Sequence, residues 1–384
     1  MEWRFTPVQR LQRFRPPFCP RRECPDHRRT QPGYRAHAHG SYTRRRGAAV
    51  PRFRCPTCGR TFSRQTFSPT YYLKRPELLV PVAAGLVAGS AHRQIARLLS
   101  CAPSTVTRLS YRAGRHFLLV MSAALEALTD KPLEPIVFDH FETFEFTQDL
   151  PFGIATAVGQ QSWFVYGIDP APHARSGRRT ASQQLRLDSR PARPRRGGYA
   201  GSTKRAIDRL LQLTSEGLHL VTDDHESYRR TIQHHPQRAR ISHEIHRNPK
   251  RGPKGSPRSQ KAIRRDRAMF ASDLLHGLAR HSMAAHRRET ISFGRRLNAL
   301  ILRFYGFAIW RNFIKRRSER KAVDMTPAMQ LGLTDRRWTW RQLFAWRRFP
   351  DRNRLDPLER LLYEQRWNTP VLPANTPHAL RLAY

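Results

Sequence analysis

The sequence has few acidic residues, few lysines and no long apolar run. It carries 29 Asp and Glu residues against 70 Lys and Arg residues, and only eight of these cations are lysines. No apolar stretch reaches the roughly 18 residues of a membrane-spanning helix, and the N-terminal residues lack the apolar core of a secretory signal. These absences exclude the integral-membrane and secreted classes, so we expect a cytoplasmic protein with no membrane partner.

Positive charge is the strongest feature that is present. The formal net charge is +41, and basic residues occur along the whole chain. An excess of this size favours a large polyanion as the partner, and nucleic acid is the usual one. Apolar residues make up 39% of the chain, which is enough for buried cores.

Composition divides the chain into five parts. Within the fourth part, two stretches rich in Pro, Gly and Arg, at about 170–203 and 247–261, cannot bury enough apolar surface to offset their ordering entropy, so we expect a basic insertion and a basic loop there. The parts are 1–75, rich in Arg and Cys with a basic N-terminal arm; 76–116, helical; 117–135, a helical connector; 136–315, with alternating strand and helix patterns; and 316–384, a basic helical tail rich in Trp and Arg.

Four of the five cysteines have the spacing of metal ligands. Two short turns, Cys-x4-Cys and Cys-x2-Cys, lie about 30 residues apart and offer four soft ligands, which suits a tetrahedral structural Zn²⁺ ion. A disulfide framework is disfavoured because the chain lacks a secretory signal. The fifth cysteine, Cys101, reads as a small buried apolar residue. The predicted zinc ligands are Cys19, Cys24, Cys55 and Cys58, with His27, His37 or His39 as an alternative to one of them.

Two short helix patterns follow the cysteine-containing part. Ser90 can cap a helix that runs to about Leu99, and Pro103 opens a second helix that runs to about Arg112. Two helices joined by three residues are typical of a helix-turn-helix, although an ordinary helical hairpin has the same pattern. The second helix is expected to offer these residues to a DNA major groove: Ser104, Thr105, Thr107, Arg108 and Arg112.

The fourth part alternates strands and helices in a recognisable order. Three strands, a helix, a strand, a further strand and a helix match the order of a ribonuclease H-like core, which has a mixed five-stranded sheet and flanking helices. In that fold one acid lies on the first strand, one just past the fourth, and a third on a helix. The expected strands are 136–141, 152–159, 162–169, 218–222 and 240–245, and the expected helices are 204–216 and 263–288.

Carboxylates at those places point to metal chemistry. Asp139 lies on a strand of Ile, Val and Phe, where an acid is costly unless it binds a cation, although pairing with an arginine is the simpler alternative. Two Mg²⁺ or Mn²⁺ ions held by clustered acids can neutralise a phosphodiester and its attacking oxygen. Asp223 and Asp224 follow the fourth strand.

The third acid has to come from the helix at 263–288. Asp273, His276 and Arg280 lie within about 60° of one another on a helix, so we choose Asp273 as the acid and the other two as phosphate-binding or supporting residues. Asp266 lies two turns earlier on the same face and remains an alternative, whereas Glu289 points away. The simpler alternative is an ion pair between Asp273 and a nearby arginine, Arg280 or Arg287.

The order of these motifs, over residues 19–315, resembles bacterial insertion-sequence transposases in which a zinc ribbon and a helix-turn-helix precede a D-D-E catalytic domain. The stretch Thr222-Asp223-Asp224-His225-x2-Tyr228 resembles the second motif of that family and implies that Asp223 is the catalytic acid. The stretch Asp273-x2-His276-x3-Arg280, followed by Ser292-Phe293, resembles the third motif, Glu-x2-Asn-x3-Arg. Here Asp replaces Glu and His replaces Asn, so the helix must lie closer to the metals.

The resemblance implies a function and its partners. It implies metal-dependent DNA cleavage and strand transfer by Asp139, Asp223 and Asp273, which would hold two Mg²⁺ or Mn²⁺ ions. The zinc ribbon and helix-turn-helix would bind the ends of the element, and a homodimer or larger assembly would act on double-stranded DNA at the nucleoid. The alternatives are an inactive or domesticated transposase that binds DNA without catalysis, and a nuclease of the same fold.

Overall fold

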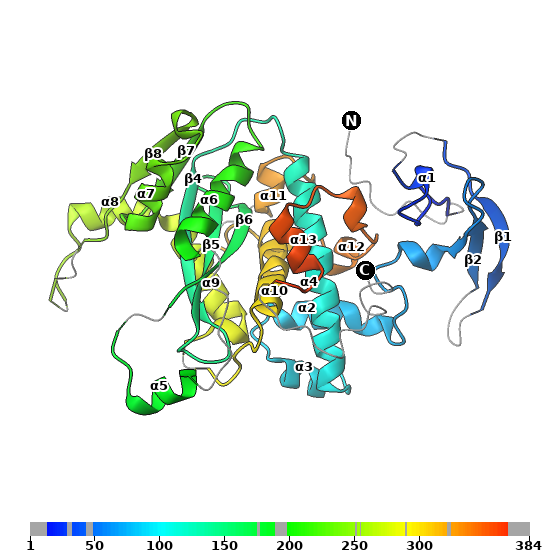
Figure 1. Cartoon of the computed structure of the whole chain (residues 1–384), viewed down its shortest axis with the longest axis horizontal. Coiled ribbons are helices and arrows are strands. Elements are labelled where there is room, and N and C mark those ends of the chain that lie inside the picture. The colour runs from blue at the N-terminus through cyan, green and yellow to red at the C-terminus, as the bar shows by residue number, and fades with distance from the viewer. Residues whose placement is uncertain are drawn as a thin grey trace.

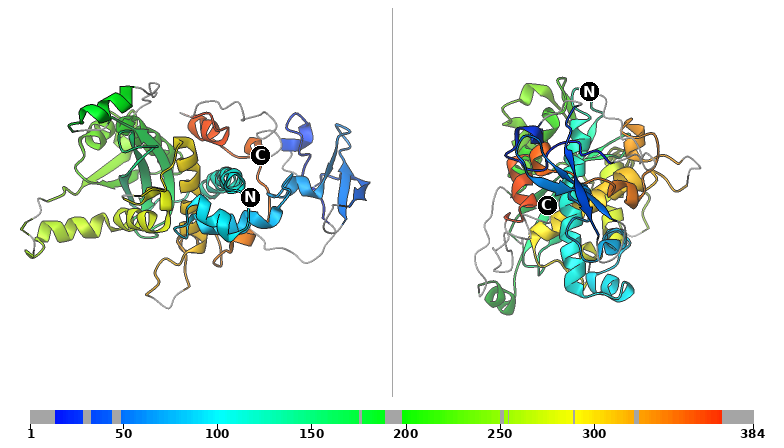
Figure 2. Two further views of the ribbon diagram at one scale, coloured as in Figure 1. Left: turned by 90° about the horizontal axis from the view of Figure 1, so that it is seen from below. Right: turned by 90° about the vertical axis from the view of Figure 1, so that its right-hand side faces the viewer.

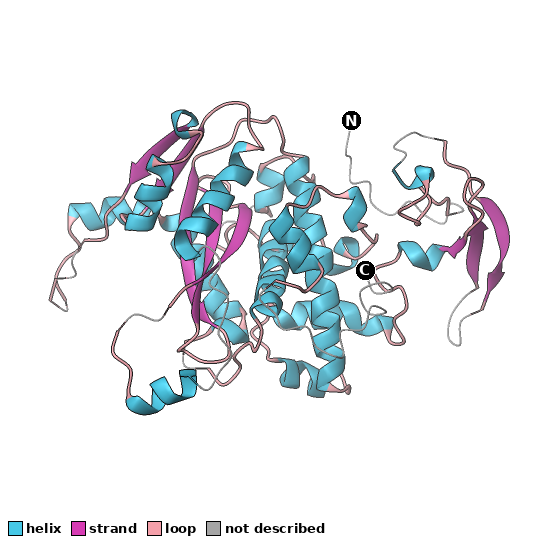
Figure 3. Cartoon of the chain, viewed as in Figure 1, coloured by secondary structure: helices cyan, strands magenta, loops and turns pink. Residues whose placement is uncertain are grey.

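The computed structural model describes residues 14–28, 33–43, 49–174, 177–188, 198–249, 252–253, 255–288, 290–320 and 324–367. Three parts follow one another along the long axis: a small cysteine-containing part, a group of helices, and a five-stranded sheet with its own helices (Figure 1). The views in Figures 2 and 3 agree on this order, with the helices between the two sheets. No helix in these described ranges has the length and apolarity needed to cross a bilayer.

The N-terminal part is held together by cysteines and a small sheet. A short helix, α1 (Pro25–Arg28), is followed by three antiparallel strands in the order β1-β2-β3. Its own buried cluster consists of Cys19, Cys24 and Cys55, with only partly buried hydrophobic residues around them. So small a core gives little hydrophobic stabilisation, and the part depends on additional cross-linking. The strands are β1 (His37–Tyr42), β2 (Val50–Arg54) and β3 (Thr61–Ser63).

A single long helix forms the centre of the molecule. Helices α2 (Leu79–Leu86) and α3 (His92–Leu98) pack against α4, which runs from Pro103 to Glu126. The expected boundary at residue 116 is therefore wrong, because α4 continues through it. The reason is packing: residues 112–124 of α4 are all buried, and the helix packs along α10 (Leu297–Ile309). At Gly114 a side chain would meet Leu302 at 2.7 Å, so the two backbones lie close together.

The five-stranded sheet has the order β6-β5-β4-β7-β8. Its first three strands pair antiparallel, whereas β4 with β7 and β7 with β8 pair parallel. The expectation of a mixed five-stranded sheet is thus confirmed, with strand ends shifted by a few residues. The strands are β4 (Ile136–Phe144), β5 (Pro151–Gly159), β6 (Val165–Pro172), β7 (Leu218–Thr222) and β8 (Ile241–Ile245).

Helices flank the sheet. Helix α6 (Gly198–Leu211) packs on β5 and β6 and against α7 (Glu226–Gln233), while α9 (Phe270–Ser282) packs on β4 and β5. The expected continuous helix at 263–288 is wrong: α8 (Gln260–Ala268) ends before Met269, and α9 begins after it, at Phe270. Helix α8 is largely charged and buries only Ala262, whereas α9 has an apolar face that packs on the sheet.

Part of the expected basic insertion is ordered. Helix α5 (Ala181–Asp188) and the first turn of α6 lie within 170–203, so the expectation of a plain loop there is wrong for these residues. Residues 189–197 lie outside the described ranges, as do Glu289 and parts of the loop at 247–261.

The C-terminal part is not a separate tail as far as residue 367. Three helices lie against the central helices, and buried residues such as Leu343 and Leu362 belong to the main core. The Phe344 ring lies 5.0 Å from Phe117 of α4, and Trp338 stacks on Phe313 at 4.9 Å. Trp338 and the buried Trp367 therefore serve packing, whereas Trp346 is exposed. The helices are α11 (Pro327–Gln330), α12 (Trp340–Leu343) and α13 (Pro357–Tyr363).

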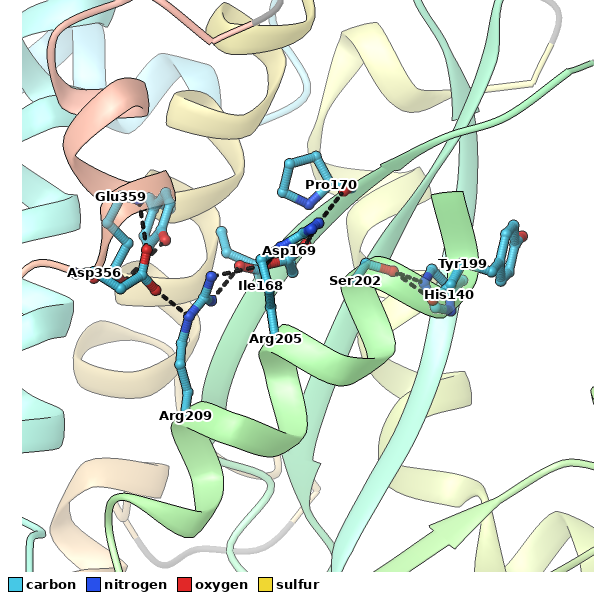
Figure 4. Close-up of polar contacts among 11 residues, drawn as sticks. His140, Ile168, Asp169, Pro170, Tyr199, Ser202, Arg205, Arg209, Asp356 and Glu359 are labelled. Atoms are coloured by element: carbon cyan, nitrogen blue, oxygen red, sulfur yellow. Dashed lines mark hydrogen bonds and ion pairs between the residues drawn. The ribbon is translucent and has the colours of Figure 1, made fainter. Parts of the chain in front are cut away.

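A buried ionic cluster joins the sheet to this C-terminal part. Asp169 of β6 is fully buried and forms ion pairs with Arg205 at 2.6 Å and Arg209 at 2.7 Å, both from α6 (Figure 4). Arg209 also pairs with Asp356, the N-cap residue of α13, whose side chain accepts a hydrogen bond from the Glu359 N–H at 2.8 Å. Two arginines thus balance acids from two distant parts of the chain.

Removal of the buried acid should be costly. We expect Asp169→Ala to lower the free energy of unfolding by about 3–5 kcal/mol, because it removes the buried carboxylate shared by two partly buried guanidinium groups and leaves Arg209 with Asp356 alone. The matched control is Glu226→Ala, which removes an exposed pair with Arg230 and should cost less than about 1 kcal/mol. Urea denaturation of both variants measures the difference, and equal effects would contradict the assignment of the cluster as a structural lock.

Candidate functional site

Four cysteine sulfurs converge in the N-terminal part. The Sγ atoms of Cys19, Cys24, Cys55 and Cys58 all lie within 4.8 Å of one another. The distance is 3.7 Å from Cys19 to Cys58 and 3.9 Å from Cys24 to Cys55. Zn–S bonds of about 2.3 Å in a tetrahedron require sulfurs about 3.8 Å apart. The cluster is therefore compatible with structural zinc, and four sulfurs leave no open position for catalysis.

Donors around the cluster favour thiolate at one ligand. Burial acts to raise the pKa of Cys55, but N–H groups of Cys58 and Thr57 and the Tyr34 hydroxyl outweigh it, so the pKa of Cys55 is lowered. Burial raises the pKa of Cys19 and of Cys24, which a bound cation would reverse. The turn at 55–58 thus supplies the backbone donors that its sequence predicts.

The histidine alternatives are wrong. His27 is buried, but its Nδ1 contacts the carbonyl oxygen of Cys19 at 2.8 Å, which fixes the loop rather than a metal. His37 and His39 lie on β1, where every residue is exposed. The four cysteine sulfurs converge without a histidine among them.

The helix-turn-helix pattern gives α3 and α4, joined at 99–102. Pro103 is at the start of α4 as expected, but the cap residue of α3 is Ala91, whose N–H donates to the Gln94 side chain, and not Ser90. Of the five residues expected to face DNA, Ser104 and Arg108 are exposed, and Thr105 and Thr107 are partly buried. Thr107 contacts His92 of α3 at 3.1 Å.

The prediction that Arg112 faces DNA is wrong. Arg112 is buried, and its guanidinium donates to the carbonyl oxygens of Pro69 and Tyr71, each at 2.8 Å. The side chain thus satisfies carbonyls of the turn that leads into the helices. The exposed part of α4 is shorter than the pattern suggests, because the helix enters the core at this point.

The first two predicted acids lie side by side. Phe138 of β4 pairs with Thr222 of β7 in parallel register. Asp139 and Asp223 are the next residues after this pair. Neighbouring parallel strands run about 4.8 Å apart, so the backbones bring both acids close together where β7 ends beside the middle of β4. Asp223 contributes to Asp139 electrostatically, since its charge raises the pKa of Asp139.

The surroundings of Asp139 disfavour the ionised form of its side chain. Burial and then the charge of Asp223 raise the pKa of Asp139 to about 7. Its Oδ1 accepts hydrogen bonds from the His140 N–H at 2.8 Å and from the Tyr228 hydroxyl at 3.3 Å. Its Oδ2 lies 3.8 Å from Nδ1 of His276. The simpler alternative, an arginine partner for Asp139, is not present among the described residues.

The structure separates Asp223 from Asp224. Asp224 forms ion pairs with Arg229 at 3.1 Å and Arg247 at 2.6 Å. Asp223 accepts hydrogen bonds from the His225 N–H and from Asn248, each at 3.1 Å, and no cation of the described chain pairs with it. Asp223 is therefore the one of these two acids without a cationic partner among the described residues.

Asp273 is less well placed. It lies on α9, one turn before His276, and its charge reaches Asp139. Its carboxylate, however, forms an ion pair with Arg265 of α8, a partner that the sequence did not suggest. Asp266 pairs with Arg258 and Arg265 and lies on α8, a different helix from the one that carries Asp273.

His276 and Arg280 face the sheet beside the acids. Nε2 of His276 contacts the Thr156 hydroxyl at 2.9 Å. Arg280 donates to the carbonyl oxygens of Glu142 and His286, and its guanidinium lies 4.3 Å from the Phe141 ring. Arg280 thus fixes α9 on β4, which leaves it little capacity for phosphate. Both residues thus make contacts with β4 and β5 within the protein.

The acids do not form a compact metal site in this structure. In the described ranges, the four cysteines are the one group of three or more His, Cys, Asp or Glu residues whose ligand atoms converge. Sequence reasoning also missed two groups behind Asp139, His140 and Ser202. A histidine in a strand of large apolar residues was the available signal, but its partner on α6 is 62 residues away.

Zinc removal should abolish the N-terminal fold. We expect one zinc ion per native chain, and loss of that ion from Cys55→Ser, because three sulfurs no longer complete the tetrahedron. Cys101→Ser is the control, since Cys101 lies outside the cluster and should retain the ion. Metal analysis of the purified proteins measures this, and a zinc-free native chain would contradict it.

The raised pKa of Asp139 predicts a stability change in protein free of Mg²⁺ and Mn²⁺. The folded pKa of about 7 exceeds the ordinary value of 3.8, so ionisation of Asp139 costs stability as the pH rises between these values. Asp139→Asn should therefore raise the free energy of unfolding, on the order of 2 kcal/mol at pH 8 and less at pH 5. Asp224→Asn loses two ion pairs and should bring no gain. Urea denaturation at both pH values tests the sign.

Comparison with known proteins gives no relative. No family model matches the chain, and no curated protein matches it. What the cysteine cluster and the acid pair can do chemically therefore rests on their own residues. The first has four convergent sulfurs at one end of the molecule, and the second has two neighbouring carboxylates where β7 ends beside β4.

Proposed function

We propose that this chain is a DNA transposase that binds the ends of an insertion element and cleaves and joins phosphodiesters with two divalent ions. The observation that carries the proposal is the register of β4 and β7, in which Asp139 and Asp223 each follow the last paired residues, Phe138 and Thr222. A pair of neighbouring acids, one without a cationic partner in the described chain, is suited to hard divalent cations.

The topology supports a ribonuclease H-like domain. Three antiparallel strands are followed by two parallel ones, and the acid-bearing β4 is the central strand of the order β6-β5-β4-β7-β8. That is the arrangement the proposal needs, because parallel β7 ends next to β4 and delivers the second acid. Helix α9 then packs against β4 and carries the third candidate, Asp273.

The chemistry needs charge neutralisation. Divalent ions, when bound, would neutralise the phosphodiester and lower the pKa of the attacking water or 3′-hydroxyl. Asp139 and Asp223 would hold them, and Asp273 could join after it leaves Arg265. His276 and Arg280 would keep α9 seated on the sheet at the distance that the shorter Asp side chain requires.

DNA binding would be shared by several parts. The +41 charge supplies phosphate contacts, while the exposed start of α4, with Ser104 and Arg108, and the zinc-compatible part would contact the element ends. Two ends must be joined, so a homodimer or larger assembly on double-stranded DNA is part of the proposal, as is a nucleoid location.

One observation favours a second candidate function. The ion pair between Asp273 and Arg265 occupies the third acid, which fits a decayed transposase that binds DNA without cutting it. The two candidates differ in metal-dependent cleavage and not in binding, so a single assay separates them.

A plasmid nicking and joining assay tests the proposal. The substrate carries the DNA that flanks this gene, with Mg²⁺ or Mn²⁺. We expect nicks that disappear in Asp139→Asn, because the variant loses a charged ligand, and that persist in Asp224→Asn. Asp273→Glu should raise the rate, since the longer side chain extends farther toward the metals.

The outcomes of that assay are distinct. Joined products identify a transposase, whereas nicks without joining identify a nuclease of the same fold. Flanking DNA that is bound but never cut, by native protein and by Asp273→Glu alike, would overturn the catalytic proposal in favour of the DNA-binding one. Affinity should fall by about 10³–10⁵ between 50 and 200 mM salt in either case.

A further inference from the structure

A hydrogen-bonded chain lies behind Asp139. The Tyr228 hydroxyl donates to Oδ1 of Asp139 at 3.3 Å and lies 2.7 Å from Nδ1 of His140. On the other side of the imidazole, Nε2 of His140 lies 2.7 Å from the Ser202 hydroxyl (Figure 4). The chain therefore runs from α6 through β4 and α7 to the carboxylate.

Every member of this chain is buried and packed. Ser202 is 0%, Tyr228 1% and His140 6% exposed. The imidazole lies 4.0 Å from the Tyr199 ring and stacks on the Tyr228 ring at 5.4 Å, with 12° between the planes. The position of the Tyr228 hydroxyl is thus set by core packing, which holds it in one place while solvent and ligands change.

The donors and acceptors fit one arrangement when Asp139 is ionised. A carboxylate can only accept, so the single Tyr228 proton goes to Oδ1. The Nδ1–H group of His140 then donates to the phenol oxygen, and Nε2 accepts from Ser202. The Ser202 hydroxyl also lies 3.0 Å from the carbonyl oxygen of Tyr199, but that oxygen accepts from the Thr203 hydroxyl at 2.7 Å, so the Ser202 proton can go to His140. Oδ1 also accepts from the His140 N–H at 2.8 Å, so two donors hold this oxygen.

The second carboxylate oxygen is left for a ligand. Within the described residues no hydrogen bond reaches Oδ2, whose neighbour Nδ1 of His276 lies 3.8 Å away. The side chain of Asp139 is 20% exposed, although the residues on either side of it in β4 are buried. A carboxylate held through one oxygen presents the other in a fixed direction. Such support is what oriented metal ligands receive from the residues around them.

We propose that Tyr228, itself held by His140, is a positioning residue that fixes Asp139 with Oδ2 free to bind a divalent cation. This inference rests on the proposed function, because it assigns Asp139 a metal. It goes beyond the acids in naming the groups that orient one of them. Loss of supporting hydrogen bonds typically lowers metal affinity by about 10–100-fold.

Mn²⁺ binding to the zinc-loaded full chain, followed by electron paramagnetic resonance, tests the inference. Tyr228→Phe removes only the hydroxyl and keeps the ring that packs on His140. We expect its half-saturating Mn²⁺ concentration to rise by about 10–100-fold. Nicking at limiting Mn²⁺ should fall and recover at saturating Mn²⁺, which a merely structural defect would not do.

Tyr166→Phe is the matched control. Tyr166 is also buried, and its hydroxyl donates to Glu134 at 3.1 Å, away from Asp139 and Asp223. It should lose similar thermal stability and bind Mn²⁺ as the native chain does. Native Mn²⁺ affinity in Tyr228→Phe would overturn the inference alone. Equal Mn²⁺ binding by native protein and Asp139→Asn would overturn the proposed function, and the inference with it.

Discussion

The parallel pairing of β4 with β7 is the contact on which the candidate site depends. It joins residues more than 80 positions apart and brings Asp139 close to Asp223 where β7 ends beside the middle of β4. The two acids repel each other, but both strands are held in position by their buried apolar residues, which belong to the main core. The core therefore stabilises an arrangement of charge that the acids alone would avoid, which is a common property of sites that bind cations.

Two clusters of buried polar groups in this basic protein share one helix, α6. Helix α6 contributes Ser202, Arg205 and Arg209 to two buried clusters, one around His140 and one around Asp169 (Figure 4). The first cluster leads to the candidate acid, and the second leads to α13. Helix α6 thus contacts β4 through Ser202 and the C-terminal part through Arg209.

The C-terminal part also connects the two ends of the molecule. Its Arg347 N–H donates to the carbonyl oxygen of Phe67 at 2.9 Å, and Phe349 packs edge-on against Phe18 at 5.2 Å, beside the cysteine cluster. The Arg352 guanidinium lies 4.0 Å from the Phe18 ring. Contacts of this kind fix the cysteine-containing part relative to the helices, so DNA bound at one end would have a defined geometry at the other.

The sequence by itself determined the local features: the ligand turns of Cys19–Cys24 and Cys55–Cys58, the start of α4 at Pro103, and the five strands with an acid on the first and after the fourth. Each depends on neighbours within a few residues, where spacing and capping decide the conformation. Only the tertiary structure decided the break at Met269, the extension of α4 past residue 116, the burial of Arg112, the Asp273–Arg265 pair and the chain from Ser202 to Asp139. These depend on which distant surface each segment packs against, and one-dimensional periodicity carries no information about that surface.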